Sequence, residues 1–296
     1  MYIFANTQFT MFEIILNAII WDPSPDIFKL PFIGWPLKWY SIMWLLGFVL
    51  SQQILFYIFK REGKPTAHIE VLTIYIFIGT LLGARFGHFL FYQPEQFFTN
   101  PLEIILPPYA GLASHGGAIG ILIALYLFCR NKKYNYNYLW MVDRLVIVVA
   151  LTGCCIRLGN LINSEILGLP TDVPWAFVFV QEDNLPRHPA QLYEAIFCLI
   201  LFVVLFMIWK KKRTTMYNGL IFGIFLITLF GQRFIVEHFK ENQVPFENVL
   251  PINMGQILSI PFVLIGIIIL MLSFRMKSRK VIFRELEEEQ VPKVKG

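Results

Sequence analysis

The stretch RLGNLINSEILG, residues 157–168, places an arginine, two asparagines and a glutamate between long apolar runs. Arg157, Asn160 and, one turn further on, Asn163 or Ser164 share one helical face, because residues three and four apart are neighbours on a helix surface. Glu165 follows where that helix is expected to end. A guanidinium group matches phosphate oxygens with two parallel hydrogen bonds. We therefore expect this stripe to bind a ligand that carries both phosphate and hydroxyl groups.

Further polar residues lie inside or beside apolar runs and are candidates for the same site. They are Tyr40, Arg85, His88, His115, His188, Gln191, Tyr193, Glu194, Arg233, Glu237 and Gln256. His115 precedes two glycines, which permit close approach of a ligand, and histidine titrates near neutral pH, so we expect proton transfer there. A cavity position is favoured for Arg85. The alternative for Arg157 is a structural ion pair with Glu165 or Glu237.

The elements that position these residues are predicted to be transmembrane helices. The chain has 296 residues, of which 56% are hydrophobic and 15% charged, a composition outside the usual range of soluble globular proteins. Runs of roughly 20 apolar residues cross about 30 Å of hydrocarbon. Such runs cover 37–59, 69–92, 114–130, 140–160, 190–209, 218–239 and 254–274. We predict an all-α polytopic membrane protein with about seven transmembrane helices.

Basic residues alternate between the connecting segments and predict the orientation of the helices. KREGK (60–64), RNKK (130–133), KKKR (210–213) and RMKSRK (275–280) follow the first, third, fifth and seventh runs. Short loops rich in lysine and arginine stay cytoplasmic, so the N-terminus is predicted outside and the C-terminus inside. The candidate polar residues then lie in the outer half of the membrane, and the inner half is apolar apart from basic loop residues. The net charge of +5 reflects this orientation and does not indicate nucleic-acid binding.

Three parts of the chain are expected. Residues 1–36 form an extracytoplasmic segment, in which residues 9–20 are too short to span and are predicted to be an interfacial helix. Residues 37–275 form the seven-helix domain that holds the site, and residues 276–296 form a polar cytoplasmic tail.

Packing rather than chemistry is predicted for several smaller residues. They are Cys129, Cys154, Cys155, Cys198 and the glycines Gly79, Gly83 and Gly87. For Gly116 and Gly120, packing is an alternative to close approach of a ligand beside His115. Cysteine behaves as a small buried apolar residue, and small residues four apart let helices approach closely. His188 precedes Pro189 at the start of a helix and is predicted to be structural. No metal is predicted, since the histidines lack neighbours at zinc spacing.

These residues resemble the prolipoprotein diacylglyceryl transferases of bacterial inner membranes. RLGNLINSEILG is similar to the signature of that family, and LKWYSIMWLLGF, LGARFGHFLFY, GLASHGGAIG, RHPAQLYE, RFIVEHF and MGQILSIP occur in the family's order over about residues 35–275. The resemblance implies transfer of the diacylglyceryl group of phosphatidylglycerol to the thiol of a lipobox cysteine in a prelipoprotein. It implies a thioether product, release of glycerol phosphate, an active site in the outer half of the inner membrane, membrane lipids as neighbours, and no cofactor.

The resemblance also implies site residues. The catalytic positions would be His115, Arg157, Arg233, Glu165, Glu237 and Tyr40, and the positions that bind phosphatidylglycerol would be Arg157, Asn160, Arg85, Arg233 and Gly168. His115 is the candidate base, since a thiol becomes a strong nucleophile only when deprotonated; one of the carboxylates is the alternative. Arg157 and Arg233 are expected to hold the departing phosphate, and Glu165 and Glu237 to orient them.

Tyr40 and Asn160 are expected to hydrogen-bond glycerol or ester oxygens. The sequence departs from the family's pattern at Lys240, where an arginine is expected, and in the TLFGQ run before Arg233, where an aromatic hydroxyl is expected. The outer loop after Gly168 is also shorter than in some members. These departures concern the contacts to phosphate and the grip on the peptide.

Two other classes of protein compete with this interpretation. A transporter or flippase for an anionic lipid would also place arginines in a cavity, but such sites usually lie near the midplane between repeated halves. No convincing internal repeat is present, and the polar residues lie on one side. An intramembrane protease would need a Ser-His, paired-Asp or zinc constellation, and no convincing set is found.

Overall fold

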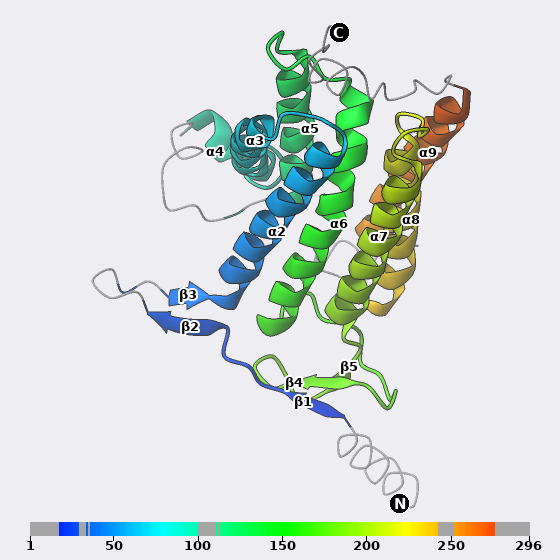
Figure 1. Cartoon of the computed structure of the whole chain (residues 1–296). Helices are drawn as coiled ribbons and strands as arrows, with labels where there is room; N and C mark the ends of the chain where they lie inside the picture. Colours follow the sequence, from blue (N-terminus) through cyan, green and yellow to red (C-terminus); the bar gives the residue numbers. More distant parts are fainter. Residues whose placement is uncertain are drawn as a thin grey trace, which may run out of the picture. The chain divides into compact units, whose positions relative to one another are not determined.

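The structure is a computed structural model that describes residues 18–29, 34, 36–99, 111, 113–241 and 252–275. Helices carry most of these residues (Figure 1). They are α2 (Trp39–Arg61), α3 (Ala67–Tyr92), α4 (Pro94–Thr99), α5 (Ser114–Arg130), α6 (Tyr138–Ile162), α7 (Ala190–Lys212), α8 (Leu220–Val236), the 3-10 helix η2 (Glu237–Phe239) and α9 (Met254–Arg275). The strands are β1 (Ile19–Trp21), β2 (Asp26–Lys29), β3 (Pro36–Lys38), β4 (Phe177–Phe179) and β5 (Pro186–Arg187).

Six of the described helices are long and apolar enough to cross a membrane: α2, α3, α6, α7, α8 together with η2, and α9. Helix α5 is a shorter apolar helix of 17 residues. Helices suit hydrocarbon because they satisfy their backbone hydrogen bonds internally. The predicted fold class, an all-α polytopic membrane protein, is confirmed, with the seven predicted runs appearing as six long helices and one shorter one.

The predictions for the two ends of the chain fall largely outside the described residues. Most of the predicted interfacial helix, residues 9–20, lies outside the described residues, as does the predicted tail, residues 276–296. Ile19 and Ile20 belong to strand β1, so at these residues the helix prediction is wrong. Strand β1 runs parallel to β4. The backbone of β1 therefore pairs with β4, whereas in a helix its hydrogen bonds would be made within the segment.

The chain divides into two compact units. Unit 1 contains residues 1–51 and 146–280, and unit 2 contains residues 52–145 and 281–296. Unit 1 therefore holds the described strands, the first half of α2, the later part of α6, and helices α7, α8 and α9. Unit 2 holds the end of α2, helices α3, α4 and α5, and the beginning of α6.

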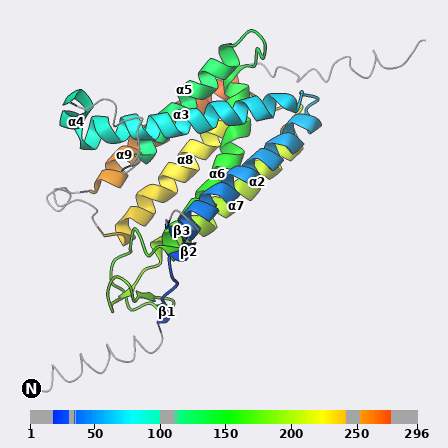
Figure 2. The ribbon, with the colours of Figure 1, turned by 90° about the vertical axis from the view of Figure 1, so that its left-hand side faces the viewer.

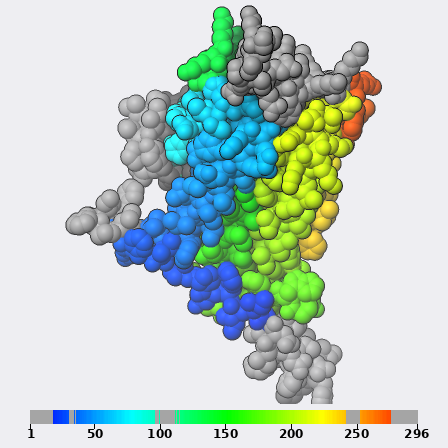
Figure 3. Space-filling view, in the orientation of Figure 1, coloured from blue at the N-terminus to red at the C-terminus, as the bar shows by residue number. Residues whose placement is uncertain are grey.

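In unit 1, helices α7 and α8 pack side by side and form a continuous yellow-green surface in the space-filling view (Figure 3). Cys154 of α6 packs with Ala195 and Cys198 of α7 in a buried apolar cluster, and Cys155 and Cys129 are buried as well. The prediction that the cysteines serve packing is therefore confirmed.

A small sheet covers the end of α6 in unit 1. Its strand order is β1-β4-β5, with β4 and β5 antiparallel. The indole of Trp21 in β1 donates a hydrogen bond of 2.8 Å to the carbonyl of Leu161, and Leu161 packs with Phe177 and Phe179 of β4. The sheet thereby fixes the end of α6, where the RLGN stretch lies.

In unit 2, helices α3 and α5 run side by side and meet through glycines (Figure 2). A Cβ atom on Gly79 would lie 2.7 Å from the carbonyl oxygen of Gly120, and one on Gly87 would lie 2.7 Å from Cα of Gly116. One on Gly83 would overlap the Gly116 carbonyl. The predicted glycine packing face is confirmed, and its partners are the glycines of α5.

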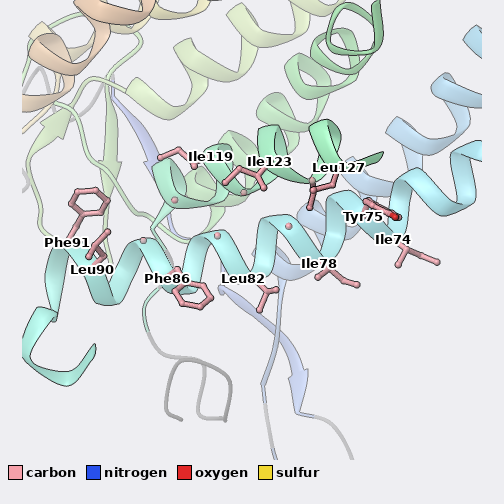
Figure 4. Close-up of a pocket in the computed structure, with 16 residues that line it drawn as sticks. Ile74, Tyr75, Ile78, Leu82, Phe86, Leu90, Phe91, Ile119, Ile123 and Leu127 are labelled. Atoms are coloured by element: carbon pink, nitrogen blue, oxygen red, sulfur yellow. The ribbon is translucent and has the colours of Figure 1, made fainter. Parts of the chain in front are cut away.

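An apolar groove of about 610 Å³ follows the same pair of helices (Figure 4). Its side chains include Ile78, Leu82, Phe86, Ile119 and Ile123, and none of the 16 described residues that line it is charged. This groove is therefore distinct from the polar cavity that the sequence predicts.

A buried ion pair in unit 2 corrects one prediction. Glu62, just after α2, and Arg144, in the second turn of α6, are joined by hydrogen bonds of 2.8 to 3.2 Å, and their side chains are 0% and 1% exposed. Asp143 is also fully buried. The expectation that the inner halves of the spans carry only basic loop residues is wrong. A charge within an apolar run is stable when an opposite charge on a neighbouring helix satisfies it.

Candidate active site

The RLGN stretch ends α6 in a tight turn that folds back on the helix. The backbone has positive φ at Ser164 (54°) and Ile166 (59°), a conformation that a β-branched residue seldom adopts. The turn brings Glu165 under two amides: Asn160 donates to Oε2 and Asn163 to Oε1, each at 3.0 Å. Such strain persists where the surroundings fix it, and here it holds both oxygens of a carboxylate in place.

Arg157 lies one turn before Asn160 and links this turn to α7. Its Nη1 donates to Oδ1 of Asn160 at 3.4 Å, and its Nε lies 3.0 Å from Oε2 of Glu194. The expected stripe of arginine, amide and carboxylate is thus present. Among the described residues, neither Glu165 nor Glu237 forms an ion pair with Arg157. The alternative therefore named the wrong partner, since Arg157 pairs with Glu194.

Glu194 belongs to a larger cluster of charges in unit 1. Lys240 Nζ lies 2.9 Å from Oε1 of Glu194 and 3.3 Å from Oε1 of Glu237. Nε of Arg233 lies 3.5 Å from the same Glu237 oxygen. The lysine side chain is 1% exposed, whereas those of Arg157 and Arg233 are 21% and 39% exposed. Two guanidinium groups therefore reach the surface of a cluster whose carboxylates and lysine are buried.

The beginning of α9 packs against Glu237. Asn253 donates a hydrogen bond of 3.1 Å to the Glu237 carbonyl, and Gln256 donates one of 3.1 Å to the carbonyl of Phe234. A Cβ atom on Gly255 would lie only 2.5 Å from Cδ of Glu237. The glycine is therefore required for the carboxylate to lie against the helix start.

Gly168 joins the turn after α6 to the segment after η2. It forms an antiparallel bridge with Lys240, and its carbonyl accepts a hydrogen bond of 2.9 Å from Nη1 of Arg187. Any Cβ at this position would overlap the carbonyl oxygen of His188. Arg187 also pairs with Asp183 and, at 2.6 Å, with Glu241. Gly168 thus has a positioning role for the backbone of Lys240.

His188 has the structural environment that was predicted for it. Its backbone N–H donates to the Leu169 carbonyl at 3.0 Å, its Nδ1 lies 3.2 Å from the Tyr193 hydroxyl, and its ring packs against Phe239. Burial lowers the pKa of His188, although the charge of Asp172 opposes the shift. A neutral ring suits this packed position.

Tyr40 lies at the start of α2, against α6. A Cβ atom on Gly159 would lie 2.9 Å from Cδ2 of Tyr40, so the glycine allows the ring to rest on the helix that carries Arg157. Tyr40 is half-buried. The residues predicted for the site that belong to unit 1 are therefore gathered around the end of α6 and the cluster of charges.

Arg85 and His115, the other two predicted site residues, belong to unit 2. Arg85 is 2% exposed, lies over the ring of Phe89 and donates to the Gly111 carbonyl at 3.2 Å. His115 opens α5, with its ring 4.9 Å from that of Phe91. Their participation in the site stays a prediction.

The contacts at the centre of the cluster do not follow from the sequence. Glu194 is among the sequence candidates for the site and Lys240 is a departure from the family's pattern, but the sequence gives neither residue a role or a partner. A usable signal was present: Glu194 is a carboxylate inside an apolar run, which requires a positive partner. The partner lies 46 residues away along the chain, a separation that spacing rules do not cover.

The fold and the site together define a polytopic membrane protein with a cluster of buried charges that presents two arginines. A family model described as "Prolipoprotein diacylglyceryl transferase" matches residues 25–272. The chain belongs to this family, whose members are transferases.

Individual relatives agree along most of their length. The phosphatidylglycerol--prolipoprotein diacylglyceryl transferase of Tolumonas auensis is 45% identical over 261 residues, which cover 88% of this chain and 100% of the relative. Proteins of the same name from Bacteroides fragilis and Chloroherpeton thalassium are 43% and 42% identical, covering 90% and 88% of this chain and 99% and 96% of their own lengths.

Proposed function

We propose that the arginine cluster of unit 1 is where this chain carries out the reaction named for its relatives. The chain transfers the diacylglyceryl group of phosphatidylglycerol to the cysteine thiol of a prolipoprotein, a step of lipoprotein maturation. A carbon–sulfur bond forms as the bond between the glyceryl carbon and the phosphate oxygen breaks. The thiol proton goes to a base, and glycerol phosphate leaves with the electron pair. The observation that carries the site assignment is the pair of partly exposed arginine side chains on buried carboxylates.

Arg157 and Arg233 bind the phosphate and stabilise the charge that grows on it as it leaves. Each guanidinium forms an ion pair with one carboxylate: Arg157 lies 3.0 Å from Glu194, and Arg233 lies 3.5 Å from Glu237. Donors fixed in advance stabilise a transition state without reorganising during the reaction. Arginine suits the task because its planar donors match phosphate oxygens.

Asn160 and Glu165 hold Arg157 in this arrangement. Both ends of the Asn160 amide are already occupied, by Arg157 and by Glu165. We therefore assign Asn160 an orienting role, and its second amide hydrogen and second lone pair remain for the expected contact to glycerol oxygens. Tyr40 is also a candidate for those oxygens, since its ring rests on Gly159 beside the same helix.

His115 is the proposed base that takes the thiol proton. The carboxylates of the site, Glu165, Glu194 and Glu237, already accept hydrogen bonds or ion pairs from Asn160, Asn163, Lys240 or the arginines. The ring of His115 lies 4.9 Å from that of Phe91 and 6.0 Å from that of Tyr92. Histidine exchanges protons near neutral pH and is suited to general base catalysis.

The placement in the membrane is proposed from the distribution of basic residues. Lys60, Arg130, Lys210 and Arg275 lie in the last turns of α2, α5, α7 and α9. The positive-inside rule then places these ends in the cytoplasm and the arginine cluster in the outer half of the inner membrane. Phosphatidylglycerol and the lipobox peptide would both meet the cluster from the outer side.

The test is transfer by the purified chain in detergent from phosphatidylglycerol to a lipobox peptide, with release of glycerol phosphate as the readout. The unaltered chain is expected to release it, and Arg157→Ala to lose at least about 100-fold in kcat. Arg157→Lys is the matched control, because lysine keeps the positive charge but lacks the planar guanidinium donors. A folded chain that binds phosphatidylglycerol but releases no glycerol phosphate would contradict the proposed site and favour a transporter.

A further inference from the structure

Lys240 joins the two halves of the cluster through one buried ammonium group. Its Nζ is 2.9 Å from Glu194, which holds Arg157, and 3.3 Å from Glu237, which holds Arg233. The order of contacts is therefore guanidinium, carboxylate, ammonium, carboxylate, guanidinium. The three inner groups are all less than 10% exposed at their side chains.

Backbone pairing also holds Lys240 in place. Lys240 bridges Gly168, and the N–H of Leu169 donates to the Phe239 carbonyl at 2.8 Å. The N–H of Glu241 donates to the carbonyl of Leu167 at 3.2 Å. The segment after η2 is thus held against the turn after α6, and the ammonium position follows from that pairing.

Charge balance explains why a cation is needed between the carboxylates. Two buried carboxylates side by side repel each other, and an unpaired buried charge is costly. Three cations against two carboxylates leave one net positive charge, which a phosphate would meet at the exposed guanidinium groups. Lysine suits the central position because its ammonium is compact and carries three donors.

We propose that Lys240 is a positioning residue that sets the spacing of Arg157 and Arg233 and keeps the pair positively charged for a phosphate group. This inference rests on the proposed function, since the phosphate is that of phosphatidylglycerol and of the released glycerol phosphate. Lys240 touches neither substrate. It acts by holding Glu194 and Glu237 in their places behind the arginines.

The first test compares Lys240→Met, which keeps the length of the side chain without its charge, with Lys240→Arg. In the transfer assay, Lys240→Met is expected to lower kcat by about 100-fold, since a misplaced catalytic group costs about that much. The KM for phosphatidylglycerol should change less, and Lys240→Arg should recover part of the loss. Lys211→Met makes the same chemical change at an exposed residue of α7 and should leave the kinetics unaltered.

The second test measures binding of glycerol phosphate to the purified chain and requires no turnover. Weaker binding by Lys240→Met than by the unaltered chain supports the proposal, even if the transfer reaction itself were not found. Unchanged kcat and unchanged binding in a folded Lys240→Met protein would overturn it. If Lys240→Met does not fold, the double variant Glu237→Gln with Lys240→Met, which removes one buried charge of each sign, is compared with Glu237→Gln alone: a lower kcat and weaker binding in the double variant support the proposal, and equal values overturn it.

Discussion

The two clusters of buried charge in this chain differ in what their arginines do. In unit 2, Arg144 gives Nε and Nη2 to Glu62 and Nη1 to the Trp140 carbonyl, and it lies 4.4 Å from the Trp140 ring. In unit 1, Arg157 and Arg233 are held on one side by a carboxylate and are partly exposed on the other. The first guanidinium is enclosed by protein, and the other two keep a face for a ligand.

Under the proposed function, this difference separates a charge that serves the fold from charges that serve the reaction. A buried ion pair with matched geometry contributes little net stability, yet removing one partner leaves a costly unpaired charge. A partly exposed arginine can be removed at small cost to the fold, while its interaction with a ligand is lost. Both clusters lie in apolar runs, so hydropathy does not distinguish them. They differ in the exposure of their arginine side chains and in how many guanidinium donors are already bonded to protein.

The largest expected effect is on stability, at Arg144. Arg144→Met should lower the free energy of unfolding by about 3–5 kcal/mol, because Glu62 is then buried without a partner. The folded fraction should keep its specific transfer activity. Unfolding in mixed micelles measures the first quantity and the detergent transfer assay the second.

The control for this change is the double variant Glu62→Gln with Arg144→Met, which removes both charges and should recover most of the lost stability. A stable Arg144→Met protein that has lost transfer would break the comparison, because the enclosed pair would then serve the reaction.

Arg233→Ala should show the opposite pattern. The transfer rate should fall by about 10²–10³-fold, the loss typical of removing one donor from a developing anion. The free energy of unfolding should fall by at most about 1 kcal/mol, since the side chain is 39% exposed and its pair with Glu237 is screened. Transfer kinetics and unfolding curves of the same Arg233→Ala protein measure the two effects. A large loss of stability would make Arg233 a residue of the fold, like Arg144.

The glycine contact of α3 and α5 offers a third, uncharged mode of joining helices. Gly120→Ala should destabilise the protein by about 1–3 kcal/mol, because the new Cβ meets the backbone of Gly79 with no room to move. Gly117→Ala is the matched control on the same helix, since its nearest atom would be 3.6 Å away. Equal thermal stability of the two variants would contradict the assigned packing.

Much of this architecture could be predicted from the sequence because it depends on local composition. Apolar length defined the helices, the spacing of Gly79, Gly83 and Gly87 defined a packing face, and the three-and-four rule placed Arg157 beside Asn160. The strands were missed because β1 and β4 are three-residue segments whose pairing joins residues about 160 positions apart. Both segments, IIW and FVF, consist of residues that favour strands, but three apolar residues are too few to distinguish a strand from part of a helix.

The ion pairs were harder to predict than the charges themselves. The sequence shows that Glu194, Glu62 and Arg144 are charges within or beside apolar runs, but not which charge each one meets. Lys240 was noted as an unexpected residue, and its central position follows from the bridge to Gly168, a contact between distant segments. Pairing is a property of the tertiary fold, so spacing within one helix could not reveal it.

The smallest expected effect concerns Asp183, in the loop that supports Gly168. The hydrogen bond from Arg187 lowers the pKa of the Asp183 carboxyl below its ordinary value, with burial opposing the shift. A lowered pKa in the folded state means that the stabilisation is present above the unfolded value of about 4 and is lost as the pH falls through the folded value. Asp183→Asn should therefore lower stability by roughly 0.2–1 kcal/mol at neutral pH. The difference in Tm between the two proteins should shrink as the pH falls below about 4. A difference that stays constant across that range would show that Asp183 supports the loop through shape and not through its charge.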